Sequence, residues 1–130
     1  VRPTSSANAH LVTKACEISY DLTTGRRLEL GLRKAFFRDA IDISDLNQLY
    51  GLLDELELDA TRINEKLYNG TAMAALMSDY RSANQARISG SPTYVIDGGR
   101  LVLFGNVSYR VIHDNIEELL SQPVNEARWC

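Results

Sequence analysis

The hydrophobic pattern of the chain changes at Gly90, and this change limits what the chain can fold into. Before Gly90 apolar residues recur at helical spacing, whereas two β-rich runs follow it, Thr93–Ile96 and Leu101–Phe104. Residues 97–100 separate the runs, and their glycines supply the positive φ that a tight hairpin needs. Both runs are apolar along nearly their whole length, which is typical of strands covered on both faces. Because two strands alone make a marginal sheet, this hairpin requires more sheet than the printed sequence supplies.

The chain before Gly90 is predicted to form a string of short amphipathic helices. Each has an apolar stripe at helical spacing, and most follow a residue that caps helix N-termini. The predicted stripes are Ala9, Val12, Ala15, Cys16, Ser19 and Tyr20 after caps at 4–6; Leu28, Leu32, Ala35 and Phe36 after a break at 23–25; Leu46, Leu49, Leu53 and Leu56 after a Ser44 cap; and Met73, Leu76, Met77 and Tyr80 from Thr71 to about Arg87. We expect Met73 and Met77 to fill the core.

Asp59 is predicted to cap a further helix over residues 60–68, which the Asn69-Gly70 pair closes. After the hairpin, Ser108 is predicted to cap a closing helix that ends before Pro123. Its stripe is Val111, Ile112, Ile116, Leu119 and Leu120. We therefore expect a helical subdomain over residues 1–88, the hairpin with its helix over 89–122, and a tail over 123–130.

Composition excludes several classes of partner. The formal net charge of -3 gives no electrostatic footprint for nucleic acid. No apolar run approaches the roughly 20 residues that span a bilayer, so we expect no membrane partner. The chain begins at Val1 without a signal-peptide pattern, which suggests a processed or truncated chain. The compartment is therefore unknown, with a cytoplasmic location slightly favoured.

The two cysteines, Cys16 and Cys130, form no CxxC and have no metal-ligand spacing. Cys16 is predicted to be a buried thiol on the apolar face of its helix, and Cys130 ends the tail. His10 and His113 are far apart in sequence and lack ligand-spaced neighbours. We therefore expect no catalytic residue, no metal site and no cofactor within this chain.

Residues 90–98, Gly-Ser-Pro-Thr-Tyr-Val-Ile-Asp-Gly, resemble the cis-proline segment of DsbA-like proteins in the thioredoxin superfamily. The hairpin, the Phe104-Gly105 closure and the final helix are similar too, and the preceding helices resemble the helical insertion of these proteins. The resemblance implies an α/β thioredoxin-like fold of the DsbA type. It is incomplete here, because the N-terminal βαβ half that carries the CxxC is not in the printed sequence. The chain as given is expected to be mostly α-helical with one antiparallel β-hairpin.

This resemblance implies that Ser91, Pro92 and Thr93 bind substrate. A cis bond before Pro92 would expose the N–H and C=O of Ser91, with which an extended segment pairs as an added strand beside the reactive thiolate. That thiolate would lie at a helix N-terminus, whose dipole lowers its pKa. From the residues alone, a trans proline that merely starts a strand remains the alternative. The expected partners are protein or small-thiol substrates, together with the missing half or a second copy that completes the sheet.

Three functions remain open. The leading hypothesis is a thiol–disulfide oxidoreductase that lacks its redox cysteines here, so that this chain alone is inactive. The second is a glutathione-dependent relative, a kappa-class transferase or 2-hydroxychromene-2-carboxylate isomerase. In those relatives an Asp that helps hold glutathione commonly stands where this chain has Val107, which counts against them. The third is a non-enzymatic helical binding module that self-associates through its uncovered apolar faces.

Overall fold

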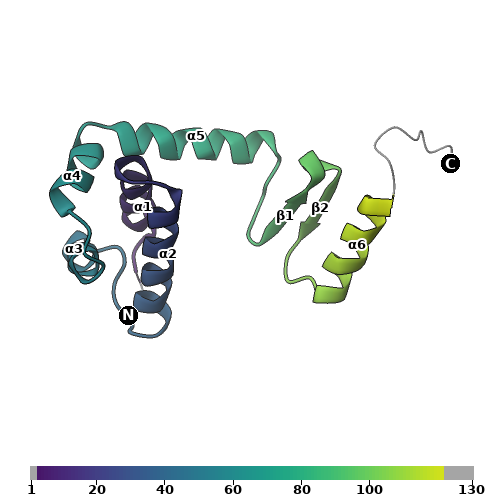
Figure 1. Cartoon of the computed structure of the whole chain (residues 1–130), viewed down its shortest axis with the longest axis horizontal. Coiled ribbons are helices and arrows are strands. Elements are labelled where there is room, and N and C mark those ends of the chain that lie inside the picture. Colours follow the sequence, from purple (N-terminus) through teal and green to yellow (C-terminus); the bar gives the residue numbers. More distant parts are fainter. Residues whose placement is uncertain (1–2, 122–130) are drawn as a thin grey trace. The chain divides into compact units, whose positions relative to one another are not determined.

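The computed structural model describes residues 3–121, which form six α-helices and one β-hairpin (Figure 1). The predicted tail at 123–130, with Pro123 and Cys130, lies outside the described residues. The chain divides into two compact units, Val1–Tyr80 and Arg81–Cys130. The elements are α1 (Ala7–Ser19), α2 (Leu22–Phe37), α3 (Leu46–Glu55), α4 (Ala60–Tyr68), α5 (Thr71–Gln85), β1 (Thr93–Ile96), a 3-10 turn η1 (Asp97–Gly99), β2 (Leu101–Phe104) and α6 (Tyr109–Ser121).

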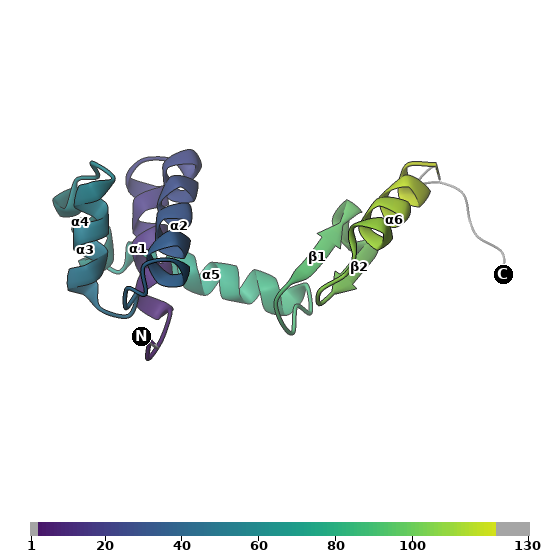
Figure 2. The same ribbon diagram turned by 90° about the horizontal axis from the view of Figure 1, so that it is seen from below.

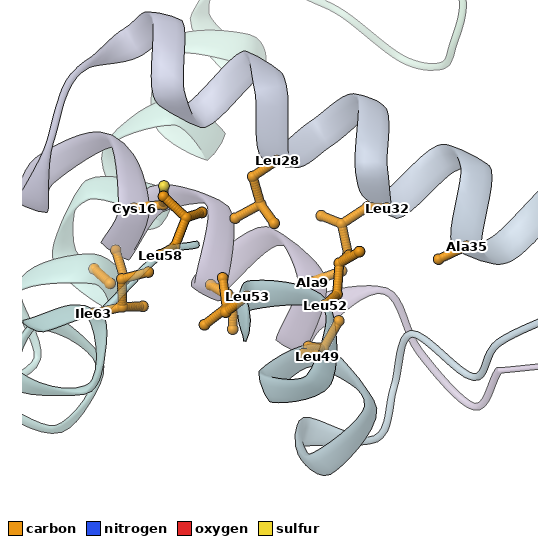
Figure 3. Packing of buried hydrophobic residues seen from close by; sticks show 13 residues of the cluster. Ala9, Cys16, Leu28, Leu32, Ala35, Leu49, Leu52, Leu53, Leu58 and Ile63 are labelled. Carbon is orange, nitrogen blue, oxygen red and sulfur yellow. The ribbon is translucent and has the colours of Figure 1, made fainter. Parts of the chain in front are cut away.

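The first unit is organised around α1, which packs against both α2 and α4. Figures 1 and 2 show α1 beside α2, with α3 and α4 on the other side of α1. Side chains from these helices and their connections meet in one core, shown in Figure 3. The buried hydrophobic residues are Ala9, Val12, Ala15, Cys16, Leu28, Leu32, Ala35, Leu49, Leu52, Leu53, Leu58, Ile63 and Ala72.

The predicted stripe of α1 is confirmed by the burial of Ala9, Val12, Ala15, Cys16 and Ser19. The Ser19 hydroxyl donates a hydrogen bond of 3.2 Å to the carbonyl of Arg62, which joins α1 to the first turn of α4. The polar residue is therefore buried with a partner.

The break expected at residues 23–25 is wrong, because α2 begins at Leu22 and includes all three residues. Asp21 caps the helix, with its carboxylate accepting a 2.7 Å hydrogen bond from the Thr24 N–H. Gly25 is buried against α1, since a Cβ there would lie 2.4 Å from the Cγ of Glu17. This glycine marks a close approach between two helices, whereas its sequence context is typical of a turn.

The cap predicted for α3 is displaced by one residue. Asp45 is the N-cap and accepts from the Asn47 N–H at 2.9 Å, whereas the Ser44 hydroxyl donates to Asp42 at 2.5 Å. Asp59 caps α4 as predicted, accepting from the N–H groups of Thr61 and Arg62. Gly70 has a φ of +81°, which confirms the left-handed close of that helix.

The burial predicted for α5 is wrong at both methionines. Met73 and Met77 are 46% and 41% exposed, and Tyr80 is 62% exposed, whereas Ala72 is fully buried. Helical spacing identifies an apolar face but does not show whether another element covers it. In the first unit, α5 therefore contacts the core through its first turn.

The second unit contains the predicted hairpin. β1 and β2 pair antiparallel in the register Thr93 to Phe104 and Ile96 to Leu101, and Gly98 and Gly99 have positive φ in the turn. α6 begins directly after Ser108, as predicted, and follows the hairpin in Figure 1. No side chain between residues 81 and 121 is buried, so this part of the chain has no core of its own. No described helix is long and apolar enough to cross a bilayer.

Candidate functional site

The predicted site, Ser91, Pro92 and Thr93, leads into β1. The peptide bond between Ser91 and Pro92 is cis. The Pro92 carbonyl accepts a 2.9 Å hydrogen bond from the Gly105 N–H, just beyond the end of β2. The Thr93 hydroxyl donates to the Gly90 carbonyl over 2.5 Å. Two hydrogen bonds therefore hold the loop, one to the neighbouring strand end and one within the loop.

Ser91 differs from its neighbours because its backbone N–H and carbonyl have no hydrogen-bond partner among the described residues. Its side chain is exposed, whereas Pro92 and Thr93 are half-buried. Within residues 3–121, no hydrogen bond reaches either its backbone N–H or its carbonyl. The same residue therefore offers one donor and one acceptor, which is the pattern that an extended peptide uses when it pairs with a strand edge.

Gly90 lies against the ring of Phe104, because a Cβ at Gly90 would come within 2.9 Å of the ring atom Cε2. Phe104 is nevertheless 62% exposed, and Val95 and Val102 of the same hairpin are 44% and 51% exposed. In the described chain the sheet has two strands, so each strand has one edge without a partner. The loop therefore adjoins an uncovered apolar sheet.

The part of the chain that the structure describes contains one cysteine, Cys16, and it belongs to the first unit. Cys16 is a free thiol in the core of the first unit and is fully buried. Burial raises the pKa of the Cys16 thiol to about 11, from an ordinary value of 9.0, so it is protonated at neutral pH. No group of three or more His, Cys, Asp or Glu side chains between residues 3 and 121 is arranged to hold a metal ion.

The turn before α6 is where an Asp that helps hold glutathione is expected in the glutathione-dependent relatives. Gly105 has a φ of +81°, and its carbonyl accepts from the Val107 N–H at 2.9 Å. The hydroxyl of Ser108 lies 3.5 Å from the N–H of Val111 at the start of α6. Val107 itself supplies no carboxylate, which counts against glutathione binding here.

A comparison with protein families matches residues 9–117 to the DSBA-like thioredoxin domain. The chain belongs to this family. Membership establishes the α/β thioredoxin-like fold of the DsbA type, and the described part of this chain is mainly helical with one antiparallel hairpin. It also places the chain among thiol–disulfide oxidoreductases and the related isomerases and transferases. Comparisons with curated proteins and with solved structures find no match.

Two contributors to the loop were missed from sequence. The sequence predicts only that Gly105 closes the second strand, whereas in the structure its N–H also donates to the Pro92 carbonyl. The sequence pattern indicates only a change of period at Gly90, whereas in the structure this glycine makes room for Phe104. The strand register would have found both, because pairing Thr93 with Phe104 places Pro92 opposite Gly105 and Gly90 near the same end of the hairpin.

Proposed function

We propose that this chain is the substrate-orienting part of a thiol–disulfide oxidoreductase of the DSBA-like family. Ser91, Pro92 and Thr93 form the loop that aligns an extended substrate segment. The reactive cysteines belong to a βαβ unit outside these 130 residues, which also completes the sheet. The single observation that carries the proposal is the open N–H and carbonyl of Ser91 beside an uncovered strand edge.

The proposed reaction is two-step disulfide exchange. A cysteine thiolate attacks one sulfur of the substrate disulfide, forming a mixed disulfide and releasing the other substrate sulfur as a thiolate. The second cysteine then attacks the mixed disulfide and releases the remaining substrate thiolate, so the enzyme pair is oxidised as the substrate gains two electrons. The reverse sequence oxidises a substrate dithiol. The loop aligns the substrate but takes no part in the electron transfer.

The burial of Cys16, the one cysteine among residues 3–121, supports placing the nucleophile elsewhere. Cys16 is buried in the first unit, and its raised pKa leaves almost no thiolate at neutral pH. We therefore expect the 130-residue chain to show no turnover in an insulin-disulfide reduction assay. Turnover comparable to that of an intact thioredoxin-fold enzyme would overturn the proposal.

The first test is the coding sequence upstream of Val1. A CxxC between a predicted strand and a predicted helix would support the proposal. A serine in the first cysteine position would instead favour a glutathione-dependent transferase or isomerase. The absence of both patterns would favour a binding module.

A second test uses the protein that carries the CxxC and two substitutions at one residue. Ser91→Pro removes the backbone N–H, whereas Ser91→Ala removes only the hydroxyl and keeps the N–H. If the backbone of Ser91 pairs with substrate, Ser91→Pro lowers kcat/KM for a disulfide-containing peptide about tenfold, which is the effect expected from the loss of one hydrogen bond. Ser91→Ala then has little effect on kcat/KM. Equal activity of both variants would contradict the role of the loop, provided that circular dichroism shows both to be folded.

A further inference from the structure

The first unit has a groove between α2 and α3 that the proposed function does not use. It encloses about 580 Å³, a volume within the roughly 300–1,000 Å³ typical of ligand pockets. Its apolar lining comes from Leu30, Ala35, Ile41, Leu52 and Leu56, and Lys34 and Arg38 line the α2 side. The Arg27 guanidinium donates to the Leu56 carbonyl at 2.7 Å and so ties α2 to the end of α3 beside the groove.

Two glycines, one on each helix, leave this groove open. Gly31 faces Leu52 and Leu56, and a Cβ there would lie 3.2 Å from a methyl carbon of Leu56. Gly51, inside α3, has no atom within 4 Å of the Cβ position. Glycine inside a helix destabilises that helix relative to alanine. No close contact at residue 51 requires the absence of a side chain there. Its lack of a side chain does, however, leave space in the groove.

The charge on the α2 side is opposite in sign to that of the whole chain. The chain has a formal net charge of -3, whereas α2 carries Arg26, Arg27, Arg33 and Lys34 against a single acid, Glu29. Two acids also line the groove: Asp39 is bound by Arg38 at 2.8 Å, and Glu55 lies on the α3 side. Lys34 has no ion pair within the described residues. The α2 wall therefore offers positive charge to an occupant.

Large apolar side chains continue this surface beyond the groove. Leu30 and Phe37 on α2 are 56% and 81% exposed. They line an adjoining depression of about 470 Å³ together with Arg33, Lys34 and Arg38, and no acid lines it. An amphipathic surface of apolar side chains flanked by cations is complementary to a segment that combines apolar and acidic residues.

We propose that the α2–α3 groove, lined by the residues named above, binds an acidic amphipathic peptide segment of a partner protein. The apolar side chains of that segment enter the groove over Gly51, and its carboxylates face Lys34 and the neighbouring cations of α2. A concave groove between two helices fits a peptide better than it fits the flat surface of a membrane. The groove lies entirely in the first unit, so this site is independent of the Ser91 loop.

The test is fluorescence anisotropy with the full 130-residue chain and a fluorescein-labelled synthetic peptide. The peptide has two heptads, with Leu at the a and d positions and Glu at the charged positions. A second peptide with Lys in place of Glu is the ligand control. We expect saturable binding of the Glu peptide that weakens as salt is raised, and no saturable binding of the Lys peptide.

Two pairs of variants locate the site. Lys34→Glu and Arg26→Glu make the same change in charge on exposed positions of α2, but only Lys34 lines the groove. We expect Lys34→Glu to weaken binding at least tenfold and Arg26→Glu to weaken it less than threefold. Gly51→Met fills the groove and should weaken binding at least tenfold, whereas its unfolding temperature should not fall, because nothing near Gly51 opposes a side chain.

Four results would overturn the proposal. The first is the absence of saturable binding of the Glu peptide. The second and third are an equal loss of binding in Lys34→Glu and Arg26→Glu, and unchanged binding in Gly51→Met. The fourth is binding of the chain to phosphatidylglycerol vesicles that an excess of the Glu peptide does not reduce. Self-association that Lys34→Glu abolishes, without competition by the peptide, would assign the groove to a second copy of the chain instead. Failure of the Ser91 tests would leave this inference unaffected, because the two sites share no residue.

Discussion

Glu17 and Gly25 are in direct contact where α1 and α2 approach each other, and the glycine makes this contact possible. A Cβ on Gly25 would lie 2.4 Å from the Cγ of Glu17, a separation that real Cβ contacts do not show. Glu17 cannot move away freely, because Lys14 holds its carboxylate at 2.7 Å and its side chain is only 15% exposed. The separation of α1 and α2 therefore depends on the absence of a side chain at residue 25.

Substituting Gly25→Ala tests this contact, with Gly51→Ala as its matched control. Alanine in a helix interior is favoured over glycine by about 1 kcal/mol, but overpacking costs about 1–3 kcal/mol. We expect Gly25→Ala to lower the free energy of unfolding by about 1 kcal/mol and Gly51→Ala to raise it by about 0.5–1 kcal/mol. Urea denaturation followed by circular dichroism measures both. Stabilisation by Gly25→Ala would show that Glu17 moves aside without cost.

Residues 23–25 illustrate why sequence patterns located the helices better than their boundaries. The Thr-Thr-Gly run is typical of a turn, but its glycine is required by a neighbouring helix, which is a tertiary contact without a local sign. The cap of α3 was misplaced for a different reason: Asp45 competes with Ser44 for the same role, and Ser44 bonds to Asp42 instead. Asp59 had no such competitor, and its prediction is confirmed.

Burial could be predicted only for an apolar face that a neighbouring helix of the same unit covers. The stripe of α1 is buried as predicted, because α2 and α4 cover it. Met73 and Met77 have the same helical spacing and are exposed. At the candidate site, the sequence located Ser91, Pro92 and Thr93 through a family resemblance. The hydrogen bond from Gly105 to Pro92 required the register of the hairpin, which local patterns determine only approximately.

Lys14 joins α1 to α5 through a salt bridge whose strength can be measured. Its Nζ lies 2.7 Å from Asp79, and this contact, followed by that with Glu17, raises the pKa of Lys14 above its usual 10.5. In a double-mutant cycle with Lys14→Met and Asp79→Asn, we expect a coupling free energy of about 0.5–1 kcal/mol, decreasing in 1 M salt. Because the folded pKa is the higher one, this contribution is complete below about pH 10 and is lost as pH rises through the folded value. A coupling near zero at low salt would show that the contact does not stabilise α5.

Cys16 should be unreactive while the protein is folded. Its thiol is fully buried, and desolvation is the main cause that raises its pKa to about 11. In a Cys130→Ser background, we expect the thiol reagent DTNB to label Cys16 at pH 8 only at the rate of unfolding, and to label it rapidly in urea. Labelling as fast in buffer as in urea would contradict the burial of this thiol.

The same thiol makes stability depend on pH in a known direction. The folded pKa of about 11 lies above the ordinary 9.0, so the folded state binds the proton more tightly than the unfolded state does. The contribution of Cys16 is therefore complete below pH 9 and is lost as pH rises towards 11. A shift of this size corresponds to about 3 kcal/mol. The stability difference between wild type and Cys16→Ala should shrink by a comparable amount between pH 8.5 and 11, and a constant difference would contradict the shift.

The two units of the chain should differ in hydrogen exchange. α1 and α2 contribute to a buried core, whereas no side chain between residues 81 and 121 is buried and the described sheet has two strands. Local opening is easiest where few apolar contacts are lost, and an isolated hairpin is marginal in water. In the 130-residue chain, we therefore expect strong protection of the Val12 and Leu28 amides. The Tyr94 and Leu103 amides, which the register places in a hydrogen-bonded pair of the hairpin, should exchange within about tenfold of the unprotected rate.

Adding the proposed βαβ unit should change this pattern selectively. If that unit pairs with the free strand edge, protection of β1 and β2 increases, because their opening then exposes a complete sheet. Protection of α1 should change little, since its core is already enclosed by α2 and α4. Equal protection of the hairpin and α1 in the chain alone would contradict the prediction. It would mean that the hairpin is already covered in the 130-residue chain, and the oligomeric state measured by sedimentation would show whether a second copy covers it.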